Sequence, residues 1–128
     1  MPKTGLAAKL FFTSMIPILV SACSSEPDIS FSRDVKPILE ANCLSCHQAG
    51  GAGFEASGLS MASYEELMKG TNAGTMVIAG DVEGSNLLVL MEGRADPSIS
   101  MPHGSMDPVP ASDIATIKQW VAQGAKNN

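Results

Sequence analysis

The feature that most constrains this chain is the segment Cys43-Leu44-Ser45-Cys46-His47, in which two thiols lie three positions apart and an imidazole follows directly. The third cysteine, Cys23, lies far upstream. A chain of 128 residues has the size of one small domain. Its fold must therefore place these three side chains together, and their shared chemistry decides what the domain is built around.

Four chemistries use two cysteines at this spacing, and three of them fit poorly. A structural disulfide is possible in an exported protein, but it would close a very small loop and leave His47 without a role. Zinc needs four ligands, yet beyond Cys23 the only other histidine is His103, and no second C-x-x-C pair is present. A thioredoxin-type redox pair follows a strand in a βαβ unit, and no strand-rich run precedes Cys43.

The fourth chemistry, covalent attachment of haem by C-x-x-C-H, uses all three side chains. Two thiols three residues apart in a helical turn lie close enough to bond the two vinyl groups on one edge of a porphyrin. The imidazole of the next residue then reaches the iron from one face. The motif occurs once in the sequence, so it predicts one covalently bound haem c held by Cys43, Cys46 and His47.

The first 22 residues have the pattern of an export signal. Lys3 and Lys9 give a positive start, and the apolar run 10–20 is too short to span a bilayer as a helix. Val20-Ser21-Ala22-Cys23 resembles the lipobox of bacterial lipoproteins, in which the cysteine sulfur is lipidated and cleavage occurs just before it. An ordinary signal peptide cut near Ala22 is the alternative.

This pattern divides the chain into three parts. We expect a lipoprotein signal peptide over residues 1–22, a lipidated N-terminus and polar tether over 23–30, and one domain over 31–128. Two or more acyl chains would give Cys23 a stable membrane anchor. In Gram-negative lipoproteins a serine after the lipidated cysteine, here Ser24, tends to accompany outer-membrane sorting. We therefore expect an exported, periplasm-facing protein that is anchored to a bacterial membrane, with the outer membrane favoured.

The second axial ligand of the iron decides whether haem only carries electrons or also binds substrate. The segment 96–110 contains four prolines and a glycine, which exclude a regular helix. A loop of this kind can cross a haem face, and Met101 is favoured as the ligand because Pro102 stiffens the backbone beside it. Met106, His103 and an open position are the alternatives. The remaining methionines after the signal fall where core packing or a helix start is expected: Met61, Met68, Met76 and Met91.

Apolar periodicity and capping residues predict four helices and almost no strand. The first covers residues 32–42, with Pro37 tolerable only in its first turn. Ser63 and Glu66 match a capping box, which predicts a helix that runs to Lys69. The other two helices are expected over residues 85–92 and from a cap at Ser112 to Gly124.

Aromatic residues are scarce for a domain of this size. Beyond residue 22 they are Phe31, Phe54, Tyr64 and Trp120. Large aromatic side chains normally supply much of the buried area of a small core. A haem at the centre would replace that area, so we expect the domain without haem to be largely unfolded.

The charge of the chain limits its partners. Beyond residue 22 there are six Lys and Arg residues against 13 Asp and Glu residues. Binding to nucleic acid or to anionic lipid needs clustered cations, so both are disfavoured. A redox protein with a basic docking surface is the partner that this charge favours.

The segments VKPILEANCLSCH, GLSMASYEELMKG, AGDVEGSNLLVLMEG, MPHG and VPASDIATIKQWVAQGA together resemble small monohaem cytochrome c domains of bacteria, most of all the planctomycete-type variety. The resemblance covers about residues 31–125. It implies an all-α, class I-like cytochrome c fold of about four helices around one covalent haem, with Trp120 packed against the N-terminal helix. It also implies Cys43 and Cys46 as thioether sites, His47 as proximal ligand and Met101 as distal ligand. The sequence departs from the family at His103, where such domains often carry another proline.

One-electron transfer by an anchored carrier, not an enzyme, is the function that these features predict. The alternatives are a haem-bearing subunit of a larger redox complex and a peroxidase or gas-binding protein with a weak or absent sixth ligand. The run Gly50–Gly53 is expected to be flexible and to leave a haem edge accessible. Arg94 is either a partner for a haem propionate or an exposed surface residue. No nucleophile–base pair or phosphate-binding loop stands out.

Overall fold

The computed structural model describes Met1 and residues 26–128. The predicted signal peptide, the predicted lipidation site Cys23 and the start of the tether lie outside the described residues. Within residues 26–128 the backbone is helical, and β geometry is confined to an isolated bridge between Thr71 and Gly74. The domain is all-α, as the sequence predicts. No helix in this part of the chain is both long and apolar enough to cross a bilayer.

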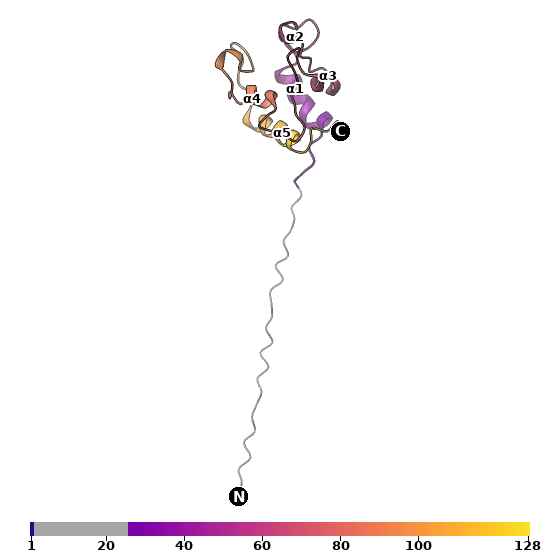
Figure 1. Ribbon diagram of the computed structural model, residues 1–128, viewed down its shortest axis with the longest axis vertical. Helices are drawn as coiled ribbons and strands as arrows, with labels where there is room; N and C mark the ends of the chain where they lie inside the picture. Colours follow the sequence, from indigo (N-terminus) through magenta and orange to yellow (C-terminus); the bar gives the residue numbers. More distant parts are fainter. Residues whose placement is uncertain (2–25) are drawn as a thin grey trace.

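Seven helical elements follow one another along the domain (Figure 1). They are η1 (Phe31–Val35, a π-helix), α1 (Lys36–Asn42), α2 (Ala52–Ser57), α3 (Tyr64–Lys69), α4 (Asn86–Met91), η2 (Pro97–Ile99, a 3-10 helix) and α5 (Ala111–Ala122). Each of the four predicted helices is present, the first as η1 joined to α1. The short helix α2 was not predicted.

A π-helical turn lets the first helix include Pro37. Ser30 caps it: the Ser30 hydroxyl accepts from the Arg33 N–H at 3.3 Å, and the Asp34 carboxylate accepts from the Ser30 N–H at 2.8 Å. The Lys36 N–H donates to the carbonyl of Phe31, five residues earlier. Pro37 then lies in the first turn of α1, the part of a helix in which proline is tolerated.

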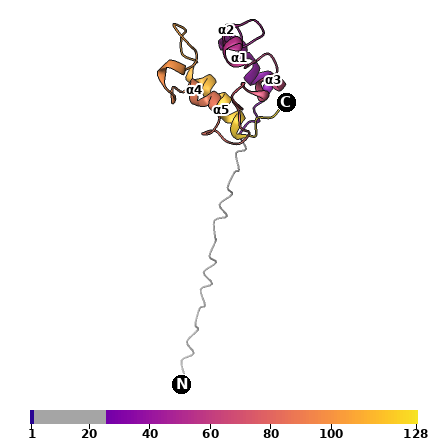
Figure 2. The ribbon, with the colours of Figure 1, turned by 45° about the horizontal axis from the view of Figure 1, so that its top comes forward.

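The core forms where α5 crosses the N-terminal helix (Figure 2). Ile117, Trp120 and Val121 of α5 are fully buried. The Trp120 and Phe31 ring centroids lie 5.6 Å apart, and Tyr64 meets Phe31 edge-on at 5.3 Å. The Trp120 indole N–H donates to the carbonyl of Lys126 at 2.9 Å, so its polar atom is satisfied. The packing of Trp120 against the N-terminal helix, implied by the family resemblance, is confirmed.

The two predicted serine caps have different outcomes. Ser63 caps α3, since its hydroxyl accepts from the Glu66 N–H at 3.2 Å. Ser112 does not cap α5, so that prediction was wrong. The helix begins two residues earlier than predicted, at Ala111, because the extended Pro110 serves as the N-cap and its carbonyl accepts from the Asp113 N–H at 3.0 Å. Ser112 therefore lies inside the first turn.

The described part of the predicted tether, residues 26–30, is held against α5 and the C-terminal segment. The Gln123 side chain donates to the Pro27 carbonyl at 2.9 Å and accepts from the Ile29 N–H at 2.8 Å. The Ser30 hydroxyl donates to the carbonyl of Asn128 at 2.7 Å. These contacts fix residues 26–30 at the end of the domain remote from α2 (Figure 1).

Candidate functional site

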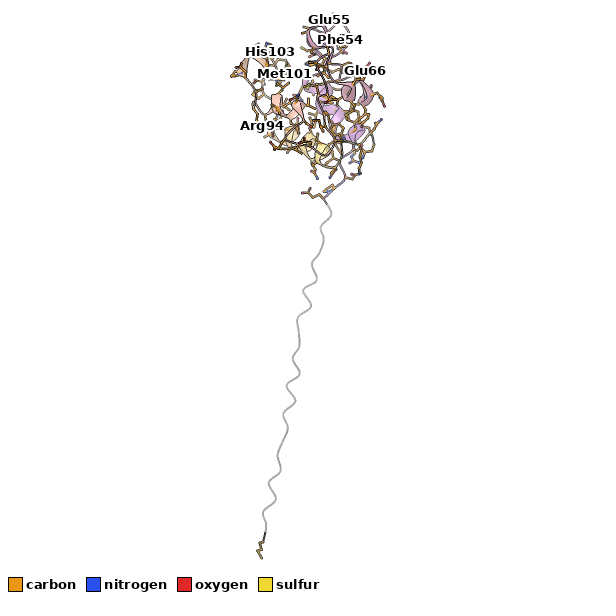
Figure 3. All side chains as sticks on the ribbon, in the orientation of Figure 1. Phe54, Glu55, Glu66, Arg94, Met101 and His103 are labelled. Carbon is orange, nitrogen blue, oxygen red and sulfur yellow. The ribbon has the colours of Figure 1, made fainter. Side chains whose placement is uncertain are left out.

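An apolar cavity of about 530 Å³ lies between two sides of the domain and opens to the solvent. Its size falls within the range of about 300–1,000 Å³ that is usual for ligand pockets. The end of α1, the following motif and α2 line one side, while α4 and the segment 98–109 line the other. Figure 3 shows Met101 and His103 on the side across from Phe54 of α2. The lining contains no Asp, Glu, Lys or Arg side chain.

His47 is buried on the wall of this cavity with a defined ring orientation. Its Nδ1 lies 3.4 Å from the carbonyl oxygen of Leu59. A carbonyl can only accept, so the tautomer with hydrogen on Nδ1 satisfies this contact and leaves the Nε2 lone pair free. A metal-binding histidine commonly uses its other ring nitrogen in this way. Backbone bonds add rigidity, since the N–H of His47 donates to the carbonyl of Cys43 at 3.0 Å and its carbonyl accepts from Met61 at 2.8 Å.

Two glycines bring α2 against the motif. A Cβ atom at Gly53 would lie 2.7 Å from Cε1 and 2.9 Å from Nε2 of the His47 ring. A Cβ atom at Gly51 would collide with the carbonyl of Cys46. That carbonyl accepts from the Phe54 N–H at 2.9 Å, which anchors the start of α2. The expected flexibility of Gly50–Gly53 was therefore wrong for Gly51 and Gly53, which are glycine because the backbone approaches the motif closely.

Both motif cysteines line the cavity as free thiols. Burial, and then the charge of the neighbouring Cys46, raise the pKa of the Cys43 thiol to about 11. This shift disfavours reactions that need a free thiolate at neutral pH, such as disulfide exchange. Among residues 26–128, no three His, Cys, Asp or Glu side chains gather as a metal site would require.

The three candidates for the distal ligand also line the cavity. Met101 is half-buried, and its backbone N–H donates to the carbonyl of Leu90 on α4 at 3.3 Å. His103 is exposed, and Met106 is 45% exposed. The structure therefore brings all three to one site, and Met101 is the most enclosed of them.

Sequence reasoning did not place three further methionines at the cavity. Met61, Met76 and Met91 are buried, as expected of core residues, and they also line this cavity. Their sequence positions carry no signal for a cavity, because α4 and the loops that carry them meet only in the tertiary structure. Met68 is not among the lining residues.

Arg94 lies outside the cavity lining and pairs with carboxylates. Its Nε donates to Glu92 at 2.7 Å and its Nη1 to Glu83 at 3.2 Å. Glu92 also accepts from Lys118 of α5 at 2.7 Å. Arg94 thus links the end of α4 to Glu83 in the loop before that helix. The structure gives no support to a role of Arg94 in binding a haem propionate.

A comparison with family models found a match over residues 43–103, to the family described as Planctomycete cytochrome C. This match supports a cytochrome c domain of planctomycete type. The matched segment runs from the first motif cysteine to His103 and so spans both sides of the cavity. The family implies covalently bound haem c and haem-based electron transfer. Separate searches among curated proteins and among solved structures found no match.

The residues present fit a haem. Two thiols and a histidine ring line one side of an apolar cavity, and thioether side chains line it as well. The ring nitrogen that faces away from the Leu59 carbonyl is free to bind iron. Thioether sulfur and imidazole nitrogen are both established haem ligands.

Proposed function

We propose that this protein is a monohaem c-type cytochrome that carries one electron at a time, with His47 and Met101 as the axial ligands. The observation that supports this most is the convergence of Cys43, Cys46, His47 and Met101 on one apolar cavity. When bound, the haem supplies an iron that changes its oxidation state by one electron. The two thiols hold it as thioethers, and the two axial side chains leave no position for a substrate.

The chain's own residues set the conditions for electron transfer. Leu59 and Gly53 hold the His47 ring in place, one by accepting from Nδ1 and the other by allowing α2 to pack against the ring. The uncharged lining excludes water and disfavours the more positive oxidation state. Together with a methionine ligand, this lining favours a reduction potential in the upper part of the range for haem proteins.

We further propose that the domain of residues 31–128 is exported and lipid-anchored through Cys23 after removal of residues 1–22, with the outer membrane favoured. The lipobox-like segment ending at Cys23 supports this placement. Mass spectrometry of the N-terminal peptide from membranes tests it. A diacylated or triacylated Cys23 is expected, whereas an unmodified N-terminus near residue 23 would contradict the anchor.

Variants of the two cavity methionines test the ligand assignment. Met101→Ala should abolish the near-infrared charge-transfer band of a methionine–Fe(III) bond and lower the reduction potential, whereas Met106→Ala should leave both unchanged. Both variants should be made in a host that attaches haem c. A band that persists in Met101→Ala and disappears in Met106→Ala would assign the bond to Met106. A high-spin ferric spectrum of the unaltered protein would instead favour an open-site haem enzyme.

A further inference from the structure

Exposed apolar side chains gather where the cavity opens. Ile99 is 53% exposed and Met106 is 45% exposed, and both line the cavity. Large apolar side chains exposed together at the mouth of a pocket are typical of an interaction surface. Three exposed carboxylates, Glu55, Asp96 and Asp107, each lie within two residues of a lining residue along the chain. We call these carboxylates together with Ile99 and Met106 the cavity rim.

The cavity rim is negatively charged. The segments that form its two sides, residues 43–62 and 95–110, contain Glu55, Asp96 and Asp107 but no lysine or arginine. Figure 3 places Glu55 at the same end of the molecule as His103. Hydrogen bonds from Ser98 lower the pKa of Asp96, so this carboxylate is ionised at neutral pH.

The cations of the domain do not offset this charge. Five of the six lysines and arginines within residues 26–128 form ion pairs with carboxylates that lie outside the cavity rim: Arg33, Lys36, Arg94, Lys118 and Lys126. The cavity lining contains no cation either. The sixth cation, Lys69, is exposed at the end of α3, two residues from the lining residue Thr71.

We propose that the cavity rim docks a redox protein that presents lysine or arginine side chains around an apolar centre. This inference rests on the proposed electron-transfer function and assigns it a place and a kind of partner. Ile99 and Met106 supply the apolar contact, while Glu55, Asp96 and Asp107 attract the cations and orient them. The same charge repels anionic lipid, so the partner is a protein and not the membrane surface.

Small charged redox complexes test the electrostatic part on the haem-loaded protein. Hexaammineruthenium(II) donates one electron to the ferric protein and becomes the ruthenium(III) complex; no atom is transferred. This reaction should slow as salt is added, whereas oxidation of the ferrous protein by anionic hexacyanoferrate(III) should accelerate. The double variant Glu55→Gln/Asp107→Asn should react about two- to fivefold more slowly with the ruthenium complex at low salt.

The variant Glu65→Gln is the matched control, because Glu65 is an exposed carboxylate on α3, away from the cavity lining. It changes the net charge without touching the rim and should leave the rate within about 1.5-fold of the unaltered protein. If Glu65→Gln slows the reaction as much as Glu55→Gln/Asp107→Asn, only the overall charge matters and the rim proposal fails. If the unaltered protein exchanges no electron with either complex, the proposed function itself fails.

A second readout does not depend on electron transfer. Octalysine added to the haem-loaded protein at low salt should shift the backbone amide resonances of residues 54–56 and 96–107. The shifts should be lost in the Glu55→Gln/Asp107→Asn variant and retained in Glu65→Gln. Shifts confined to α3 or α5 would overturn the proposed docking surface.

Discussion

At the residue scale, Gly53 determines the position of the His47 ring as directly as the hydrogen bond to Leu59 does. The ring of His47 is held from one side by the Leu59 carbonyl and contacts the backbone of α2 at Gly53. No side chain fits between them, since even a methyl group would lie within 2.7 Å of the ring. The glycine is needed for this close approach and not for flexibility.

We expect Gly53→Ala to destabilise the haem-loaded protein by about 1–3 kcal/mol, because the ring or α2 must move to admit the methyl group. The movement should also shift the ferric absorption spectrum and the reduction potential. Denaturant unfolding and a redox titration measure the two effects. Ala111→Ser, at the exposed start of α5 and outside the cavity lining, is the control and should change neither. Wild-type stability and spectrum in Gly53→Ala would contradict this packing argument.

At the element scale, two serines with similar sequence contexts have different roles. Ser63 lies just before α3 and accepts a hydrogen bond from a free backbone N–H, whereas Ser112 lies inside the first turn of α5. The sequence marks both as caps. The difference arises from Pro110, whose extended backbone ends the preceding loop and starts α5 two residues early.

Ser63→Ala should therefore cost about 1 kcal/mol of unfolding free energy, the usual value for loss of an N-cap. Ser112→Ala should be neutral within a few tenths of a kcal/mol, because alanine suits a helical turn. Urea unfolding of both variants makes the comparison. Equal losses would show that Ser112 caps α5 in solution.

The ion pairs that join α4 to α5 make stability depend on pH. Hydrogen bonds from Lys118, and then from Arg94, lower the pKa of Glu92 below its ordinary value of 4.5. The Glu92 carboxylate of the unfolded chain therefore binds a proton more readily than that of the folded chain. The stabilisation by these ion pairs is fully present above about pH 4.5 and is lost as the pH falls below that value. The cationic partners keep 42% (Lys118) and 34% (Arg94) of their side-chain exposure, and screening by water limits the stabilisation to about 1 kcal/mol or less.

Glu92→Gln should lower the unfolding free energy by up to about 1 kcal/mol at pH 7 and by much less near pH 3. Denaturant unfolding at both pH values measures the difference. Glu83→Gln is the control, since that carboxylate is 80% exposed and should contribute little at either pH. If Glu92→Gln lowers the unfolding free energy equally at pH 7 and pH 3, the stabilisation by Glu92 is not electrostatic.

At the scale of the whole molecule, the cavity and the core share residues. Met61, Met76, Leu87, Met91 and Val109 belong to the buried core and also line the cavity. Without haem, the apolar side chains that line this cavity of about 530 Å³ would lose the group that covers them. A small domain is stable by only about 5–15 kcal/mol, so it depends on burying such surface.

Removal of the haem should therefore unfold most of the domain. The double variant Cys43→Ala/Cys46→Ala, which cannot form the thioethers, should lose most of its helical circular dichroism and its cooperative unfolding transition. The haem-loaded wild-type protein is the reference. A haem-free variant with native helix content and a sharp transition would contradict the view that haem completes the core.

What the sequence by itself determined is local. The C-x-x-C-H spacing, the capping residue of α3, the apolar stripe of α5 and the proline-rich loop each act over a few residues, so they can be read without a fold. They predict the all-α class, the bounds of most helices and part of the cavity lining. Only the tertiary structure decided α2, the approach of Gly53 to His47, the three buried methionines at the cavity and the pairing of Arg94. The methionines meet from segments distant in sequence, whereas the other contacts join residues at most eleven positions apart. None of these contacts leaves a periodic pattern in the chain.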